Sequence, residues 1–373
     1  MSDTLQMKRP SRAVVDAVDF ANALKKVSLV LKKSVIPVLE EVRIQFSNGR
    51  CILTATDLNA WVTAEIPAEG EDFSFVFSRT KDVGRVCRNF SGKITIELSD
   101  IVTDKHSHPV VTMTCGSRAA EFDTYSATDF PTTPEVKEAP AFSVNAAGLL
   151  ERINKVAYAT ERLSTEAREI RSCVQFADKR IFALDGIRAA WDEGDMNFTQ
   201  PFMVLAEPLR FLKVFDGSQV DFCFSTTHLF VTNGAATVIY RLAEGQPFNL
   251  MQAVPQNYVE ELTVSPKEFL RELKYLSDVI PTTNKPYVYL RGTELFMSVN
   301  SKRFSTSVDI HRTSDMTVGL NLHYLTDALK QFAAEKRVTV KISGVYSPVV
   351  IEAKGRSDRA LILPVRVSAD AAA

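Results

Sequence analysis

The stretch Phe20-Ala-Asn-Ala-Leu-Lys-Lys-Val-Ser-Leu-Val-Leu31 is the first of three similar segments along the chain. Its counterparts are Leu149-Leu-Glu-Arg-Ile-Asn-Lys-Val-Ala-Tyr-Ala159 and Phe269-Leu-Arg-Glu-Leu-Lys-Tyr-Leu276. In each, apolar residues recur at three- and four-residue spacing, which is typical of an amphipathic helix. Copies of one unit can place equivalent surfaces around an axis. The triplication therefore predicts an assembly with a shared inner face rather than one catalytic cleft.

Each copy continues with a second helix-like segment, over 80–90, 207–215 and 323–332. Between the helices the apolar period is two, which indicates strands. The expected strand pairs are 42–46 with 51–56, 174–176 with 181–184, and 288–290 with 295–299, followed by strands at 93–98, 220–224 and 337–342. We therefore expect an α+β fold of three repeated domains, each with two helices packed on antiparallel sheets.

Proline-punctuated stretches place the domain boundaries. The predicted domains are 13–135, 139–257 and 260–367, each a common size for a domain with its own core. The tails 1–12 and 368–373 are small and polar, and we expect them to be disordered.

Composition excludes several classes of protein. Hydrophobic content is 45% and charged content 24%, no apolar run could cross a bilayer, and the N-terminus lacks the apolar core of a signal peptide. A cytoplasmic protein that does not enter a membrane is expected. The cysteines, Cys51, Cys87, Cys115, Cys173 and Cys223, lie far apart in mostly apolar stretches, which predicts reduced and buried thiols.

Charge is unevenly distributed along the chain, although the formal net charge is only −1. Six helix windows hold 20 basic and 9 acidic residues, namely 20–33, 79–93, 149–162, 206–215, 265–280 and 321–337. If these helices face one way, that face attracts a polyanion without reading base sequence. The two most basic windows, 20–33 and 79–93, lack the interleaved aromatics that stack single-stranded bases, so duplex backbone fits better. The alternative is that lysine and arginine are simply good helix formers on solvated faces.

The cations that we expect on this face share positions within the helix windows. They are Lys25, Lys26, Lys32, Lys33, Arg79, Lys81, Arg85, Arg88, Arg152, Lys155, Arg210, Lys213, Lys267, Arg271, Lys274 and Lys330.

Motifs for catalysis are missing from the sequence. Ser91-Gly-Lys93 lacks the spacing of a phosphate-binding loop, and there is no nucleophile elbow. His106 and His108 could chelate a metal, but a solvated loop is the better interpretation. Asp57 and Asp185 follow strand ends, where carboxylates commonly cap turns. We expect no catalytic residue, no metal and no cofactor. A repeat-built nuclease, the alternative from another class, would need a carboxylate cluster.

Over residues 13–367 the chain resembles the bacterial DNA polymerase III beta subunit, the sliding clamp family. The resemblance is carried in order by Pro37-Val-Leu-Glu-Glu-Val-Arg-Ile44, Ala127-Thr-Asp-Phe-Pro131, Ala183-Leu-Asp-Gly-Ile-Arg188, Glu244-Gly-Gln-Pro-Phe248 and Leu361-Ile-Leu-Pro-Val-Arg-Val367. It implies a non-enzymatic processivity factor. Two copies would close head to tail into a ring of six domains around duplex DNA, with helices lining the channel.

The resemblance also implies a peptide pocket for the replicative polymerase, the clamp loader and repair proteins. Position by position it would use Arg171, Leu184, Gly186, Ile187, Arg188, Ala189, Phe248, Gln252, Asn321, Tyr324, Ser347, Leu361, Ile362, Leu363, Pro364, Val365 and Arg366. The dimer contact would set Ala120 and Phe122 against Val279 and Ile280.

Departures from the family pattern lie in this pocket. The usual Thr-Asp-Gly-His-Arg-Leu reads Leu184-Asp-Gly-Ile-Arg-Ala189, Arg171 falls where a leucine is usual, and the order Phe-Pro becomes Pro247-Phe248. The alternative function is therefore a clamp-fold paralogue of a mobile element or divergent lineage, with altered partner specificity.

Overall fold

The computed structural model describes residues 10–102, 107–135, 139–163, 169–278, 286–299, 302–312, 314 and 316–367. The chain divides into two compact units. Unit 1 comprises Met1–Leu150 and Glu207–Leu242, and unit 2 comprises Glu151–Ala206 and Ala243–Ala373. The division runs through the middle repeat, so each unit holds one outer repeat and part of the middle one. The three domain boundaries given above stay a prediction.

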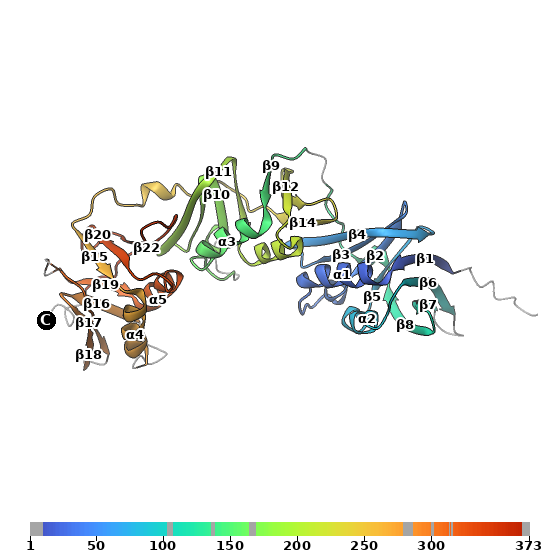
Figure 1. Cartoon of the computed structure of the whole chain (residues 1–373), viewed down its shortest axis with the longest axis horizontal. Helices are drawn as coiled ribbons and strands as arrows, with labels where there is room; N and C mark the ends of the chain where they lie inside the picture. Colours follow the sequence, from blue (N-terminus) through green and yellow to red (C-terminus); the bar gives the residue numbers. More distant parts are fainter. Residues whose placement is uncertain are drawn as a thin grey trace, which may run out of the picture. The chain divides into compact units, whose positions relative to one another are not determined.

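Unit 1 contains a twelve-stranded sheet in the order β1-β6-β7-β8-β5-β2-β3-β4-β14-β13-β12-β9 (Figure 1). Neighbouring strands are antiparallel throughout, and β4 joins the first repeat to β14 of the middle repeat. The strands are β1 Ser11–Asp16, β2 Arg43–Ser47, β3 Arg50–Thr56, β4 Ala60–Gly70, β5 Phe73–Phe77, β6 Lys93–Val102, β7 Ser107–Cys115, β8 Arg118–Tyr125, β9 Phe142–Asn145, β12 Gln219–Phe224, β13 His228–Thr232 and β14 Ala236–Arg241.

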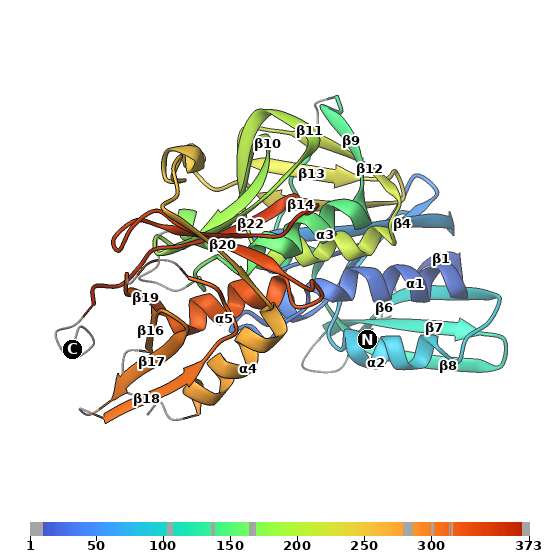
Figure 2. The same cartoon turned by 60° about the vertical axis from the view of Figure 1, so that its left-hand side comes forward.

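Two helices of unit 1, α1 (Ala17–Val27) and α2 (Thr80–Cys87), lie side by side (Figure 2). α1 begins at Ala17 because the Asp16 side chain accepts hydrogen bonds from the backbone N–H groups of Val18 and Asp19. Its buried face includes Phe20 and Leu24, which pack toward the sheet. Shorter 3₁₀ segments are η1 Ser28–Val30, η2 Pro37–Glu40, η3 Ala127–Asp129 and η5 Glu207–Phe215.

Unit 2 contains a six-stranded sheet, β10-β11-β22-β21-β20-β15, and a four-stranded sheet, β18-β17-β16-β19. The strands are β10 Cys173–Leu184, β11 Arg188–Leu205, β15 Glu260–Val264, β16 Tyr287–Arg291, β17 Glu294–Val299, β18 Lys302–Ser307, β19 Val318–Asn321, β20 Val338–Ile342, β21 Val349–Glu352 and β22 Asp358–Ile362. Here β11 of the middle repeat pairs with β22 of the last, so this junction also is a continuous sheet.

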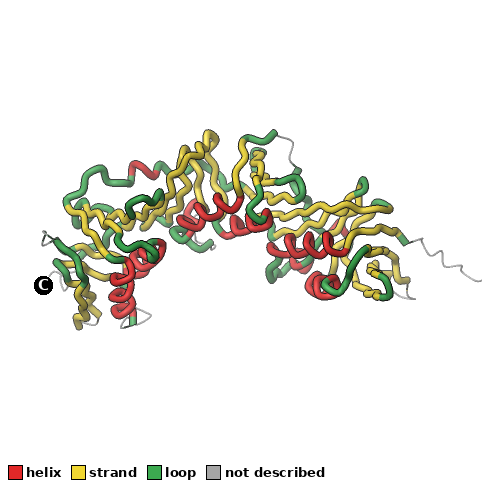
Figure 3. Tube along the Cα trace, viewed as in Figure 1, coloured by secondary structure: helices red, strands yellow, loops and turns green. Residues whose placement is uncertain are grey.

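The helices α4 (Pro266–Ser277) and α5 (Leu322–Gln331) of unit 2 pack against each other. Within each unit the α-helices lie on one face of the strands (Figure 3). The core of the last repeat combines Phe269 and Leu273 of α4, Leu325 and Leu329 of α5, and strand residues such as Val340. The remaining segments are α3 Ala146–Ala157, whose sequence crosses from one unit to the other, η4 Glu169–Ser172 and η6 Leu250–Gln252.

Much of the prediction from sequence is confirmed. The fold is α+β with antiparallel strands, and all six helix-like segments are helical, although 207–215 is a 3₁₀ helix. The turn between β2 and β3 places Asn48 and Gly49 at positive φ, as a two-residue hairpin turn requires. All five cysteines are buried and free. Burial raises the pKa of the Cys87 and Cys173 thiols to about 12, so neither is a reactive thiolate.

Two expectations are wrong. Residues 174–176 and 181–184 do not form a hairpin, because both belong to β10 and pair with β11. The register shifts around Asp178 are absorbed as an irregularity in the ladder, so the polar stretch 177–180 continues the strand instead of reversing it. The N-terminal tail is shorter than expected, since Ser11 and Arg12 already lie in β1, paired with Leu98 and Glu97.

No helix in the described part of the chain is long and apolar enough to cross a membrane.

Candidate peptide site and basic helix face

Three turns of the molecule share one design. The Oδ1 atom of Asp57 accepts hydrogen bonds from the N–H groups two and three residues later, at 3.0 Å each. Asp185 Oδ1 does the same at 2.9 Å each, and Asn233 Oδ1 does so at 3.2 and 2.9 Å. The predicted turn-capping role of Asp57 and Asp185 is confirmed, and Asn233 is a third instance that the sequence reading missed.

In two of these turns, the residue two positions after the capping side chain forms a backbone hydrogen bond to the next repeat. The carbonyl of Asn59 accepts a hydrogen bond from the Arg241 N–H at 3.0 Å, just past the junction of β4 with β14. The carbonyl of Ile187 accepts one from the Leu363 N–H at 2.8 Å, just past the junction of β11 with β22. The predicted peptide site lies at the second of these junctions.

Exposed apolar side chains gather at that second junction. Ile187 is 46% exposed, Phe248 45% and Leu363 37%, although all three are apolar and sit on ordered backbone. Close to them in the sequence lies a buried cluster formed by Phe182, Ala189, Trp191, Leu250, Val350 and Leu361, in which Leu250 is two residues from Phe248 and Leu361 two residues from Leu363. A buried floor with an exposed apolar rim is the arrangement expected of a peptide-binding surface.

Arg188 fixes the turn that carries Ile187. Its guanidinium donates from Nε to Asp185 at 3.0 Å and from Nη1 to Asp327 of α5 at 2.8 Å, and it lies 4.5 Å from the ring centre of Tyr324. The Arg188 side chain is 11% exposed and Asp185 9%, so this pair is largely desolvated, whereas Asp327 is 40% exposed. Arg188 therefore positions the turn at the site, and its charge is already paired within the protein.

Several other predicted site residues have structural surroundings. Ala189, Leu361 and Ile362 are buried, and the Asn321 side chain caps α5 by accepting from the N–H groups of His323 and Tyr324. Val365 packs on the Tyr289 and Phe296 cluster. The residues that remain accessible are Arg171, Leu184, Gly186, Ile187, Phe248, Gln252, Tyr324, Ser347, Leu363, Pro364 and Arg366.

Arg171 lies against the same turn. A Cβ atom added to Gly186 would be 3.3 Å from the Arg171 guanidinium carbon, and Gly186 has a φ of +93°. Arg171 is 39% exposed, and its only ion pair among the described residues is a 4.0 Å contact with Glu161. The predicted charge at the rim of the site is therefore present beside Ile187.

Gln175 is a site residue that the sequence reading missed. Its side chain is fully buried in β10, and its Oε1 accepts a hydrogen bond of 2.7 Å from the Phe248 N–H. This bond fixes the segment that carries Phe248 onto the sheet, next to an open pocket of about 240 Å³ that Phe182, Phe248 and Met251 help to line. In the sequence, the one indication of this role was the polar residue Gln175 between the apolar residues Val174 and Phe176.

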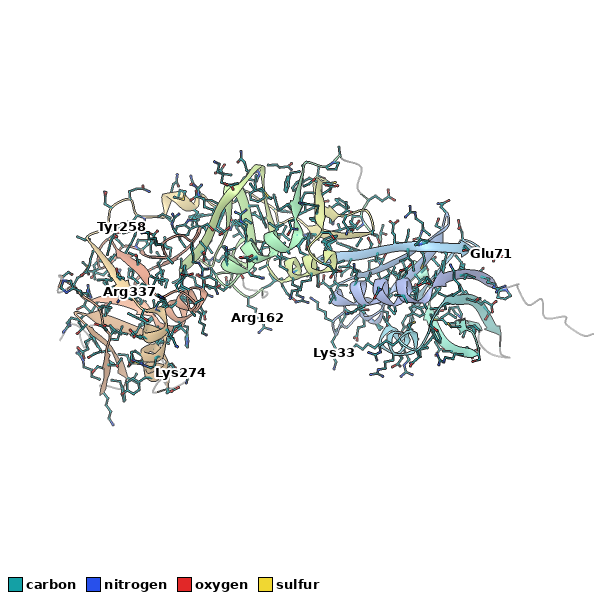
Figure 4. The ribbon with its side chains drawn as sticks, viewed as in Figure 1. Lys33, Glu71, Arg162, Tyr258, Lys274 and Arg337 are labelled. Atoms are coloured by element: carbon teal, nitrogen blue, oxygen red, sulfur yellow. The ribbon has the colours of Figure 1, made fainter. Side chains whose placement is uncertain are left out.

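The sixteen predicted channel cations fall into two groups. Ten form ion pairs within the chain, namely Lys26, Lys32, Arg79, Arg85, Arg152, Lys155, Arg210, Arg271, Lys274 and Lys330. The other six are exposed and have no acidic partner within 4.0 Å among the described residues: Lys25, Lys33, Lys81, Arg88, Lys213 and Lys267. Figure 4 shows Lys33 and Lys274 extending from the helix side of their units.

Arg152 and Lys155 of α3 have a specific internal role. Both reach Asp192 of β11, which is 1% exposed, and Asp192 also accepts a 2.7 Å hydrogen bond from the Ser357 hydroxyl. A carboxylate this deeply buried requires compensating charge. The two cations are therefore committed to the protein interior, whereas the sequence reading assigned them only to the basic face.

The predicted dimer residues are only partly described. Ala120 and Phe122 lie half-exposed on β8, where the Phe122 ring contacts Phe77 edge to face at 6.2 Å. Val279 and Ile280 lie outside the described residues, as does His106. Within the described ranges, no three His, Cys, Asp or Glu side chains lie together in a way that could hold a metal ion.

Comparison with known proteins points to one family. Residues 13–134 match the family described as DNA polymerase III beta subunit, N-terminal domain. The beta sliding clamp of Chlamydia trachomatis is 21% identical over an alignment of 387 positions that covers 99% of this chain and 90% of that protein. Among solved structures, the Bacillus subtilis sliding clamp is 18% identical, with a TM-score of 0.80 over 97% of this chain and all of that one.

A second solved structure is the Pseudomonas aeruginosa sliding clamp bound to griselimycin, which is 17% identical, with a TM-score of 0.78 over 96% of this chain and all of that one. The neighbours share the whole fold, and the matched first repeat and the full-length relatives agree on one family. The first repeat therefore matches the DNA polymerase III beta subunit family, and over nearly its whole length the chain is similar, as a divergent relative, to the beta sliding clamps.

Proposed function

We propose that this chain is a non-catalytic processivity factor: two copies close into a ring around duplex DNA and hold partner proteins by short peptides. The observation that carries the proposal is the exposed apolar rim of Ile187, Phe248 and Leu363 close to a buried apolar cluster, on a chain similar to the sliding clamps. The partners that we propose are the replicative polymerase, the clamp loader and repair proteins, and the cytoplasm is the expected location.

An edge strand supports ring closure. The β8 residues Arg118–Asp123 pair with β7 on one side, whereas β5 pairs only with Thr124 and Tyr125. In unit 2, β18 is likewise an edge of its sheet. Unpaired strand edges are templates for pairing with another chain. Light scattering is expected to give twice the 41.5 kDa mass of one chain. A stable monomer at micromolar concentration would contradict the ring.

The six cations with no acidic partner among the described residues support contact with the DNA backbone, which is sequence-independent. Replacing Lys25, Lys33, Lys81 and Arg88 by alanine is expected to weaken duplex binding and to flatten its dependence on salt, since each lost phosphate contact removes about 0.9 from the salt slope. The matched control replaces the paired cations Lys26, Lys32, Arg79 and Arg85, and should change the slope less. Equal slopes for both variants and the parent chain would contradict the assignment.

The peptide site separates the proposal from its alternative, a paralogue with altered partner specificity. A fluorescein-labelled clamp-binding peptide from a replicative polymerase is expected to bind, and Ile187→Ser with Leu363→Ser should weaken binding roughly tenfold or more. Val259→Ser is the control, because Val259 is also exposed but lies outside the site. A dimer that binds duplex DNA but not this peptide would favour the alternative, which the departures at Arg171, Leu184 and Ile187 motivate.

A further inference from the structure

Unit 1 has its own gathering of exposed apolar side chains. Six large apolar residues described in unit 1 are exposed, and four of them lie in the segment 29–36 that follows α1 and in the Asp57 turn: Leu29, Val35, Ile36 and Leu58. Val35 is 99% exposed. Isolated exposed apolar residues are ordinary, but a group of four at one place marks an interaction surface.

The backbone that carries this group is well tied. The Ser34 N–H donates to Glu40 Oε1 at 3.1 Å, and the Ile36 N–H donates to the Ser34 hydroxyl at 3.1 Å. Lys32 then joins this loop to the other turn, since its Nζ lies 3.0 Å from Asp57 Oδ2, next to Leu58. Because hydrogen bonds and an ion pair hold both turns, Val35 and Leu58 are presented on a fixed surface.

Leu58 occupies a backbone position that favours glycine. It follows the Asp57 cap directly and has a φ of +70°. The residues directly after the other two caps are Gly186 and Gly234, with φ of +93° and +84°. A leucine in this left-handed region is strained. Burial of the side chain does not offset this strain, because Leu58 is 43% exposed. The leucine therefore has a role other than stabilising the fold.

Three exposed cations flank the patch, and of the two carboxylates beside it, Glu40 accepts a hydrogen bond from the Ser34 N–H and Asp57 pairs with Lys32. Lys25 lies one helical turn before Leu29, Lys33 lies two residues before Val35, and Arg241 is the last residue of β14 and donates its N–H to Asn59; all three are exposed. Lys33 extends from unit 1 in Figure 4. The nearby carboxylate of Asp57 is 3% exposed and already bound by Lys32. A partner of this surface is therefore expected to be acidic.

We propose that Leu29, Val35, Ile36 and Leu58 form a second docking surface, which binds a short acidic peptide segment of a partner protein through one or two apolar anchors. The surface is separate from the site at Ile187 and Leu363, and it does not depend on that site. At the first junction Asn59 and Arg241 take the places of Ile187 and Leu363, so the same peptide is not expected to bind both.

The test uses the full chain with Ile187→Ser and Leu363→Ser, so that the other site is removed. Short fluorescein-labelled peptides composed of leucine, phenylalanine, aspartate, glutamate, glycine and serine are selected on this chain. Their affinities are then measured after Val35→Ser with Ile36→Ser, and after the control Val18→Ser, which replaces an exposed valine near the start of α1. Both variants change exposed side chains, so folding should be unaffected.

The expected result is a set of peptides that combine acids with apolar residues. Val35→Ser with Ile36→Ser should weaken their binding roughly tenfold or more, Val18→Ser should leave it unchanged, and added salt should weaken it. Selection of no such peptide, or equal binding to both variants, would overturn the proposal. A short labelled DNA duplex is the last arm. If the Val35 and Ile36 substitutions weaken duplex binding but not peptide binding, the patch contacts DNA and the proposal fails.

Discussion

At the junction between β4 and β14, one buried rung pairs Ala64 with Ala236, whereas the corresponding rung between β11 and β22 pairs Asp192 with Asp358. The correspondence follows from the turns, because Ala64 and Asp192 each come seven residues after the capping aspartate. The backbones match, down to the hydrogen bonds from Arg241 to Asn59 and from Leu363 to Ile187. The side chains differ completely.

The carboxylates of Asp192 and Asp358 lie opposite each other on neighbouring strands and repel, so the second junction requires cations close to them. Arg152 and Lys155 neutralise Asp192, and Arg356 forms two hydrogen bonds of 2.8 Å with Asp358. Arg356 also reaches Glu335 at 3.3 Å. Both junctions bury apolar residues, the first Val62, Val238 and Tyr240 and the second Ala190, Ala360 and Leu361. The second junction adds a pair of buried carboxylates, and the charges that neutralise them come partly from the distant helix α3.

The largest expected effect comes from removing one charge of the second junction. Arg152→Met leaves Asp192 buried with Lys155 at 3.8 Å as its remaining cation. Breaking a buried ion pair in this way should lower the free energy of unfolding by about 3–5 kcal/mol. Urea unfolding measures it in a Trp61→Phe background, where Trp191 on β11 is the sole tryptophan and reports this junction.

The matched control for Arg152→Met is Lys26→Met, because the Lys26 partner Asp216 is 74% exposed. An exposed pair should contribute about 0–1 kcal/mol. Similar losses for the two substitutions would mean that the Asp192 network is not what holds the second junction.

An intermediate effect distinguishes the two capped turns. Leu58→Gly should raise the free energy of unfolding by about 1 kcal/mol, because glycine adopts positive φ without the steric cost that leucine bears. The reciprocal change, Gly186→Leu, should destabilise, since its side chain would also displace the Arg171 guanidinium. Thermal unfolding measures both, with Trp61 as reporter for the first turn and Trp191 for the second. A destabilising Leu58→Gly would show that leucine contributes to the fold there.

The features that could be predicted from the sequence are those set by neighbouring residues along the chain. Apolar periodicity predicted the six helical segments, and the position of Asp57 and Asp185 after strands predicted their caps. The commitment of Arg152 to Asp192 could not be predicted, because it depends on which residues of β11 and α3 meet across 40 positions of sequence. The single strand β10 was likewise misread, because its irregular pairing with β11 is set by the partner strand.

The candidate peptide site also combines local features, which the sequence can predict, with tertiary features, which it cannot. Its backbone turn is local and its residues are those that the resemblance predicts, but which of them are buried is a tertiary property. Leu361 and Ile362 alternate with neighbours as any strand does, and only the packing of Trp191 and Val350 on one face makes Leu361 part of a floor rather than a rim.

The smallest expected effect concerns the outer face of the second junction. There an alternating series of charges crosses the six-stranded sheet, linking Arg180 to Glu193 at 2.8 Å, Glu193 to Arg359 at 3.4 Å, Arg359 to Glu352 at 3.0 Å and Glu352 to Lys341 at 2.7 Å. The corresponding rung of the first junction pairs Thr63 with Thr237, which carry no charge. Added salt should therefore lower the contribution of this face to stability at the second junction, and not at the first.

Arg359 is the sensitive position, because it bridges Glu193 of the middle repeat and Glu352 of the last. Arg359→Ala should cost about 1 kcal/mol at low salt, the sum of two partly exposed pairs, and the cost should shrink near 1 M salt, where screening acts within about 3 Å. Urea unfolding followed by Trp191 measures it, with Lys354→Ala as the control at an exposed lysine outside the series. Because the charges of the buried Asp192 network are shielded from solvent, the loss from Arg152→Met should persist at high salt. A loss from Arg359→Ala that is equally insensitive to salt would mean that the arginine acts through packing on Trp191 of β11, its register partner, rather than through its charge.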